Sequence, residues 1–157
     1  MRIICFICLL MVFLMPSDNP AAVNHLSDSQ RKLLADPTLF RPLKSKTEIP
    51  PAVLALCSDL HGRMADIGQR WEATDVITND TLPRKRLIWA VVYQDYYIVH
   101  YERGGRGHSF HVLLAQTRAG EKADLLWRAV GEKYSDLTAF RNALTNNQMD
   151  DDPKFAY

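Results

Sequence analysis

The chain has 157 residues, of which 47% are hydrophobic and 24% charged, and its formal net charge is +1 at pH 7. This length suits one domain, and the apolar content is sufficient for a hydrophobic core, which excludes a chain that is disordered throughout. The near-zero net charge argues against a dedicated nucleic-acid-binding protein, since such proteins carry a strongly basic face.

The N-terminal segment has the pattern of an export signal. Arg2 precedes an uninterrupted apolar run of 13 residues, from Ile3 to Met15. A run of this length is typical of a signal peptide and is short for a membrane span, which needs about 20 residues. We therefore interpret residues 1–22 as a signal peptide with an ill-defined cleavage site and predict a secreted or periplasmic protein. The alternative is an uncleaved membrane anchor; otherwise the mature form is expected to contact no membrane.

Residues 23–48 are interpreted as a linker or an arm that lies on the domain, because prolines interrupt them. Within this stretch, a short helix is predicted over residues 27–35, with Ser27 or Asp28 as its N-cap. A single α+β domain is expected over residues 49–147.

The domain is predicted to open with a helix and a strand. Pro51–His61 has apolar residues at helical spacing and precedes Gly62, a typical helix stop. Cys57, the one cysteine left after removal of the signal peptide, lies on the apolar face of this helix and is interpreted as a buried side chain. Arg70–Ile77 is rich in β-branched and aromatic residues, which predicts the first strand.

Three consecutive antiparallel strands are predicted next. Leu87–Tyr93 and Tyr96–Glu102 have strand-like composition and are joined by a two-residue turn, Gln94–Asp95. The third strand, residues 108–116, follows the glycine-rich stretch Arg103–Gly107, in which glycine permits the positive φ angles of a hairpin.

The C-terminal part is predicted to add a strand and a helix. Residues 123–130 fit either element, and their position after a meander favours the strand. A helix is expected over residues 135–144, capped by Ser135, and residues 148–157 are interpreted as a mobile acidic tail. The predicted fold is therefore α+β: a four- to five-stranded antiparallel meander sheet packed with an N-terminal and a C-terminal helix.

The length of the glycine-rich loop decides which histidines meet on the sheet. An even number of loop residues would put His100, Glu102 and His111 on one face, which is the register that the apolar pattern favours. A three-residue loop with a glycine bulge would instead place His108 and Phe110 beside His100 and turn His111 to the other face.

A group of cations is predicted at one end of the sheet. The two-residue turn places Arg86 almost opposite Arg103, so that residues 84–86 meet Arg103 and Arg106 near the glycines. Arginines beside glycine-rich backbone are a suitable setting for an anion. The candidate ligand-binding residues are therefore Arg84, Arg86, Arg103, Arg106 and His108. The alternative is a set of solvated charges at the ends of the strands.

His100, His111 and Glu102 are the candidate catalytic residues and also the candidate metal ligands, because imidazole and carboxylate groups serve both purposes. The sequence contains no motif for a zinc site, a phosphate-binding loop or a serine nucleophile. We therefore predict no bound metal and no cofactor. Either role would require the three side chains to converge.

These patterns predict a small exported binding domain without catalytic activity, whose partner is an unknown protein or a small anionic ligand and not a nucleic acid. One alternative is a small metal-binding or hydrolytic enzyme that uses a face with His100, His111 and Glu102. A second alternative is an inhibitor or immunity-type protein, for which small α+β domains are suitable.

Overall fold

The computed structural model describes residues 25–119 and 122–152. The predicted signal peptide, residues 1–22, lies outside the described residues, and so does the end of the predicted acidic tail, residues 153–157. A search of the described part for a helix long and apolar enough to cross a membrane finds none.

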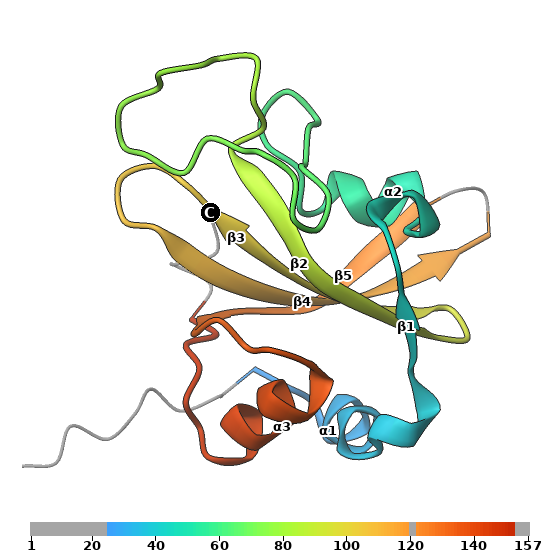
Figure 1. Ribbon diagram of the computed structural model, residues 1–157. Coiled ribbons are helices and arrows are strands. Elements are labelled where there is room, and N and C mark those ends of the chain that lie inside the picture. The colour runs from blue at the N-terminus through green and yellow to red at the C-terminus, as the bar shows by residue number, and fades with distance from the viewer. Residues whose placement is uncertain (1–24, 120–121, 153–157) are drawn as a thin grey trace, which may run out of the picture.

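A five-stranded antiparallel sheet forms the centre of the molecule, and its strands follow one another in sequence order (Figure 1). The sequence-predicted α+β class with an antiparallel meander is confirmed. The ambiguous residues 123–130 form a strand, as their position after the meander favoured. The strands are β1 (Arg41–Leu43), β2 (Lys85–Tyr93), β3 (Tyr96–Arg103), β4 (Ser109–Arg118) and β5 (Lys122–Gly131).

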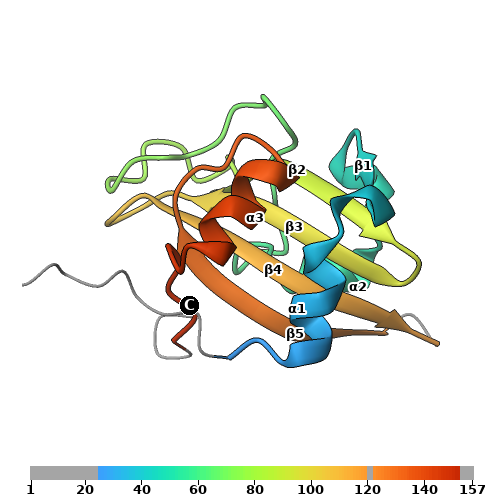
Figure 2. The ribbon, with the colours of Figure 1, turned by 90° about the horizontal axis from the view of Figure 1, so that it is seen from below.

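Helices cover both faces of the sheet. Helix α1 (Asp28–Ala35) and helix α3 (Leu137–Thr145) lie together across one face, which we call the α1/α3 face (Figure 2). Helix α2 (Pro51–Ala55) and the loops that follow it lie on the opposite face, the α2 face (Figure 1). The chain therefore has three layers, with the sheet in the middle.

The helix boundaries follow from local hydrogen bonds. Ser27 caps α1 through its side chain, as predicted, whereas the N-cap of α3 is Asp136 and not the predicted Ser135. Helix α2 is shorter than the predicted 51–61, because the carboxylate of Asp59 accepts the backbone N–H groups of His61 and Arg63 and closes a separate loop. Gly62, with φ of 70°, serves this loop and does not end a helix.

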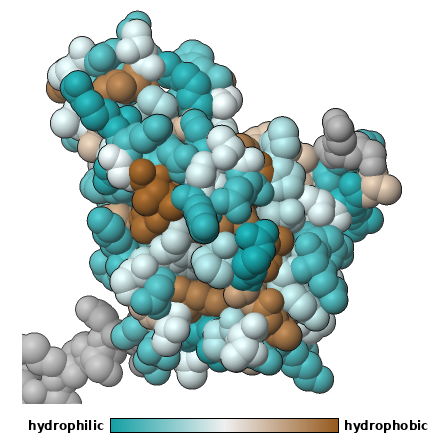
Figure 3. All heavy atoms as spheres, turned by 45° about the vertical axis from the view of Figure 1, so that its right-hand side comes forward, coloured by the Kyte–Doolittle hydropathy of each residue, from teal (hydrophilic) through white to brown (hydrophobic). Residues whose placement is uncertain are grey.

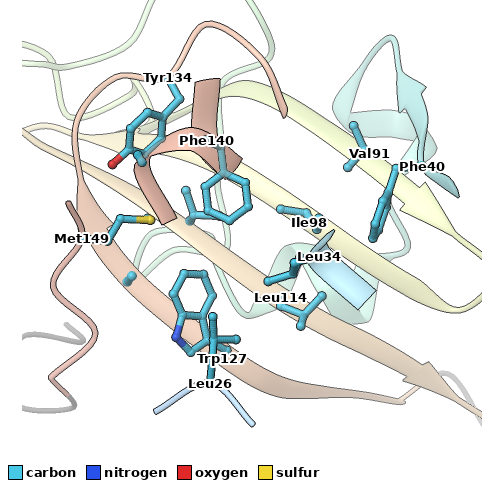
Figure 4. Packing of buried hydrophobic residues seen from close by; sticks show 13 residues of the cluster. Leu26, Leu34, Phe40, Val91, Ile98, Leu114, Trp127, Tyr134, Phe140 and Met149 are labelled. Carbon is cyan, nitrogen blue, oxygen red and sulfur yellow. The ribbon is translucent and has the colours of Figure 1, made fainter. Parts of the chain in front are cut away.

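Each face of the sheet has its own hydrophobic core. Phe140 of α3 packs against Trp127 of the sheet at 6.3 Å between ring centroids, and Figure 4 shows both rings between the helix and the strands. The core of the α2 face contains fewer aromatic side chains than the core of the α1/α3 face. The α2-face core is formed by Leu43, Ile49, Val53, Cys57, Met64, Leu87, Ala90, Val99, Tyr101, Leu113 and Ala115.

The β3–β4 hairpin has a register different from the even-loop register that we favoured. Five residues, 104–108, separate β3 from β4, and Glu102 lies opposite Phe110 while Tyr101 lies opposite His111. An odd loop places His108 and Phe110 on the face of His100 and turns His111 to the other face, as the bulged alternative predicted. The loop can adopt this length because Gly105 and Gly107 have φ of 105° and 76°.

A bulge in β2 also corrects the predicted pairing of arginines. The two-residue turn is present, since Tyr93 lies opposite Tyr96, but the register shifts by one residue between Leu87 and Trp89. The shift places Arg86 opposite Glu102, and Lys85 takes the predicted place of Arg86 opposite Arg103. One extra residue thus gives Arg86 an ion-pair partner, whereas Arg103 still lies opposite a cation, Lys85.

The predicted strand Arg70–Ile77 is an irregular loop. The buried carboxylate of Glu72 accepts the backbone N–H groups of Thr74, Thr78 and Asn79, which folds this segment back on itself. The edge beside β2 is occupied instead by β1. A local side-chain acceptor therefore overrides the β propensity of the segment.

Both ends of the described chain are built into the fold. Leu26 and Leu34 lie in the α1/α3 core, so the predicted arm contributes packing well before residue 49. At the other end, Met149 is buried, and Asp151 accepts hydrogen bonds from the indole Nε1 of Trp127 at 3.0 Å and from the backbone N–H of His25 at 2.8 Å. Residues 148–152 are thus a packed extension and not the beginning of a mobile tail.

Candidate functional site

The candidate catalytic and metal-binding residues do not converge. His100 and Glu102 belong to the α1/α3 side of the sheet, whereas His111 faces the α2 side, because the hairpin loop is odd in length. No group of three or more metal-ligating side chains is found among residues 25–119 and 122–152. The convergence that the enzymatic alternative required is therefore not met by these three residues.

His100 is a fully buried structural link. Its Nδ1 lies 2.9 Å from the carbonyl oxygen of His111, and its Nε2 accepts the backbone N–H of Tyr134 at 3.1 Å. These partners assign the neutral tautomer with the proton on Nδ1. Burial lowers the pKa of His100 to about 4, so the ring is uncharged at neutral pH. Both nitrogens are occupied, and none is left for proton transfer.

His111 is buried in a different environment. Its ring stacks on that of Tyr101 at 5.1 Å, and its Nε2 lies 2.8 Å from the hydroxyl of Ser109. Its Nδ1 is buried and forms no hydrogen bond within the described chain. Burial, and after it the positive charges of Lys85 and Arg103, lower the pKa of His111 to about 4.

Glu102 anchors two of the candidate anion-binding residues. Its Oε1 accepts a hydrogen bond from Nε of Arg86 at 2.7 Å and forms an ion pair with Nη2 at 2.7 Å, and its Oε2 lies 2.9 Å from Nε2 of His108. Arg86 also lies over the ring of Trp71, 5.1 Å from its centroid. The charge of Arg86 is thus matched inside the protein by a buried carboxylate.

Two of the other candidate residues, Arg84 and Arg103, line a pocket of about 780 Å³ on the α2 side. It lies between the loop after α2, the loop over residues 77–82 and the ends of β2 and β3. Figure 3 shows exposed apolar surface, in brown, below the part of the molecule that protrudes at the top of the view. The lining residues that matter most here are Leu60, Ile77, Leu82, Arg84, Lys85 and Arg103.

The pocket combines an apolar rim with a cationic wall. Leu60 is fully exposed and Ile77 is 51% exposed, which is unusual for aliphatic side chains on adjoining loops. Four cationic side chains, of Arg63, Arg84, Lys85 and Arg103, line the pocket together with the carboxylates of Asp59 and Asp80. The balance of charge inside the pocket is therefore positive.

Asp59 is an internal structural group of this pocket. Its carboxylate accepts hydrogen bonds from the backbone N–H groups of His61 and Arg63 and from the side chain of Arg63 at 3.3 Å. Although burial opposes ionisation, these hydrogen bonds and the charge of Arg63 lower the pKa of Asp59, so it is ionised at neutral pH. Its oxygens are therefore occupied by Arg63 and by the backbone.

Glu72 fixes the loop over residues 72–79, which lies over the pocket and which we call the roof. The hydroxyl groups of Thr74 and Thr78 donate to its two oxygens at 2.6 and 2.8 Å, in addition to the backbone donors. These hydrogen bonds lower the pKa of Glu72 to about 2. The roof is also fixed at the hairpin, because a Cβ on Gly104 would lie 2.3 Å from the carbonyl oxygen of Glu72.

The five predicted anion-binding residues are therefore divided. Arg84 and Arg103 line the pocket, Arg86 and His108 contact Glu102, and Arg106 is exposed on the hairpin tip outside the pocket lining. The division follows from the bulge and the odd loop. Sequence reasoning missed Leu60 and Ile77 as pocket residues, since an exposed aliphatic side chain in a loop gives no signal before the loop is folded. Lys85 was expected in the group of cations but not among the ligand-binding candidates.

Comparisons with protein-family models, with curated proteins and with solved structures give no match.

Proposed function

We propose that this protein is a small exported binding domain, secreted or periplasmic, which takes a small anionic ligand with an apolar portion into the pocket of the α2 side. The observation that carries the proposal is the lining of this pocket: a cationic wall beside exposed aliphatic side chains, in a volume of about 780 Å³. Pockets for small molecules fall between about 300 and 1,000 Å³.

Charge and polarity indicate the chemical class of the ligand. A carboxylate would meet Arg84 and Arg103, whose guanidinium groups suit bidentate recognition. An aliphatic chain would lie against Leu60 and Ile77, which are otherwise exposed to water. An inorganic anion would use only the first of these features, so a medium-chain carboxylate is the better probe.

The proposal is tested by titrating octanoate into the full-length protein and into an Arg84→Gln/Arg103→Gln double variant, with isothermal calorimetry at low salt. We expect saturable binding to the wild type and a loss of at least tenfold in affinity for the double variant, the equivalent of about 1.4 kcal/mol. Arg106→Gln is the matched control, because it removes an arginine that lies close in sequence but outside the pocket; its affinity should be that of the wild type.

A second variant tests the apolar half of the pocket. Leu60→Asn places a neutral polar amide on the rim at an exposed position, where the fold has little to lose. Octanoate affinity should fall while sulfate affinity changes little. Equal affinities in the wild type and the Arg84/Arg103 variant, or no saturable binding by either, would refute the proposal.

A further inference from the structure

Lys85 occupies a position in the pocket that the arginines do not share. It lies opposite Arg103 across the β2–β3 pair, and its Nζ donates to the carbonyl oxygen of Ser58 at 2.9 Å. The same Nζ lies 5.3 Å from the ring centroid of Tyr101. The amine is thus held at the inner wall of the pocket, between a carbonyl oxygen and an aromatic ring.

The surroundings of Lys85 disfavour its charged form. Burial lowers the pKa of Lys85, and the positive charges of Arg103 and Arg128 lower it further. Cys57 offers no compensating charge, because burial raises the pKa of its thiol to about 12. Asp59 is the ionised carboxylate on the pocket side, and its charge raises the pKa of Lys85 against the lowering by burial.

We propose that Lys85 is a covalent capture site for ligands that carry a carbonyl group next to a carboxylate, such as 2-oxo acids with an aliphatic chain. This inference rests on the proposed function, since the same arginines would hold the carboxylate and the same rim would hold the chain. The neutral form of an amine is its nucleophilic form, and burial beside other cations increases the share of that form at a given pH.

The step is the formation of an imine. The lone pair of neutral Nζ attacks the carbonyl carbon, and a C–N bond forms while the C–O π bond breaks to give a carbinolamine. Loss of water then gives the C=N bond; the carbonyl oxygen leaves with the two hydrogens that the nitrogen gives up. No oxidant or reductant is consumed, and hydrolysis by water reverses the step.

The test uses 2-oxooctanoate, with sodium cyanoborohydride added to reduce the imine to a stable secondary amine, followed by peptide mass spectrometry. We expect most of the adduct on Lys85, although Lys32, Lys44, Lys122 and Lys133 are more exposed to the reagents. Labelling of Lys85 should also reach its plateau at a lower pH than labelling of the exposed lysines. Lys85→Arg keeps the positive charge and should lose this adduct, whereas Lys133→Arg should keep it.

Octanoate separates this inference from the proposed function, because it has the carboxylate and the chain but no ketone. If octanoate binds and competes with 2-oxooctanoate, while the adduct is spread evenly over the exposed lysines, covalent capture is wrong and the binding site stands. If octanoate does not bind but Lys85 is still labelled selectively, the reactive amine stands and the carboxylate-binding site is wrong. Absence of both results refutes both.

Discussion

The two faces of the sheet differ in how far their buried polar groups are hydrogen-bonded. On the α1/α3 face, the buried polar groups are matched: His100 is bonded through both ring nitrogens, and the indole nitrogens of Trp89 and Trp127 donate to Tyr134 and Asp151. On the α2 face, Nδ1 of His111 and Nε of Arg84 are buried and form no hydrogen bond within the described chain.

The cover of each face explains this difference. Helices α1 and α3 cover the α1/α3 face with buried apolar side chains. A five-residue helix and irregular loops cover the α2 face and leave a pocket. Buried polar groups that lack partners cost stability and are therefore informative about function. Both faces have a buried core, and the unmatched polar groups beside the pocket support the proposal that the α2 face binds a ligand.

The largest expected effect is on the helical face. Phe140→Ala should lower the free energy of unfolding by about 3–5 kcal/mol, because Phe140 is fully buried and its removal leaves a cavity beside Trp127. Leu60→Ala, in the pocket rim, should change it by less than about 0.5 kcal/mol. Urea denaturation measures both. Similar losses in the two variants would contradict the burial of Phe140 in the α1/α3 core and the exposure of Leu60 on the pocket rim.

The next effect is a loss of stability in acid. The pKa values of His100 and His111 are each lowered to about 4, by burial first, from the 6.5 of an exposed histidine. Below pH 6.5 the two histidines bind protons in the unfolded chain, whereas in the folded chain they bind protons only near pH 4. Stability therefore falls as the pH falls from 6.5 to 4. The loss amounts to at most about 3 kcal/mol for each histidine.

His111→Phe separates the two faces in this experiment. The variant keeps an aromatic ring on Tyr101 but removes the titrating group of the α2 face. The acid loss, measured by urea denaturation between pH 7 and pH 4.5, should shrink by roughly half. Glu72 contributes little in this range, because its lowered pKa of about 2 costs stability mainly below pH 4.5, where the carboxyl of the unfolded chain takes up a proton. An unchanged acid loss would mean that His100 alone carries the effect.

The most local effect is expected for Glu72→Gln, which acts on the roof of the pocket. A neutral amide cannot replace a carboxylate that accepts from Thr74, Thr78 and Asn79, so this loop should open more often. Limited proteolysis should cut the loop faster, and the unfolding midpoint should fall as well, because the hydrogen bonds that lower the pKa of Glu72 stabilise the folded chain. Asp75→Asn removes an exposed carboxylate of the same loop and should leave the cleavage rate as in the wild type.

Much of the fold could be predicted from local pattern. The alternation along residues 87–116 and the two-residue turn at 94–95 were sufficient for the meander, and Ser27 was sufficient for the start of α1. The candidate site could be predicted only in part. Arg84 and Arg103 lie together in the pocket, but Arg86 and His108 are bound to Glu102, because an inserted residue in β2 changes which side chain faces which.

The sequence by itself determined the class of fold, the order of the strands and the gathering of cations at one end of the sheet, since these depend on short-range periodicity and on turns between neighbours in the chain. The tertiary structure alone decided the bulge in β2, the odd loop between β3 and β4 and the replacement of residues 70–77 by β1 at the sheet edge. These features depend on long-range contacts: the Arg86–Glu102 pair, the contact of Gly104 with Glu72 and the packing of both faces. A shift of one residue in a strand exchanges its two faces, so contacts distant in sequence decided which histidine lies beside His100 and which arginines line the pocket.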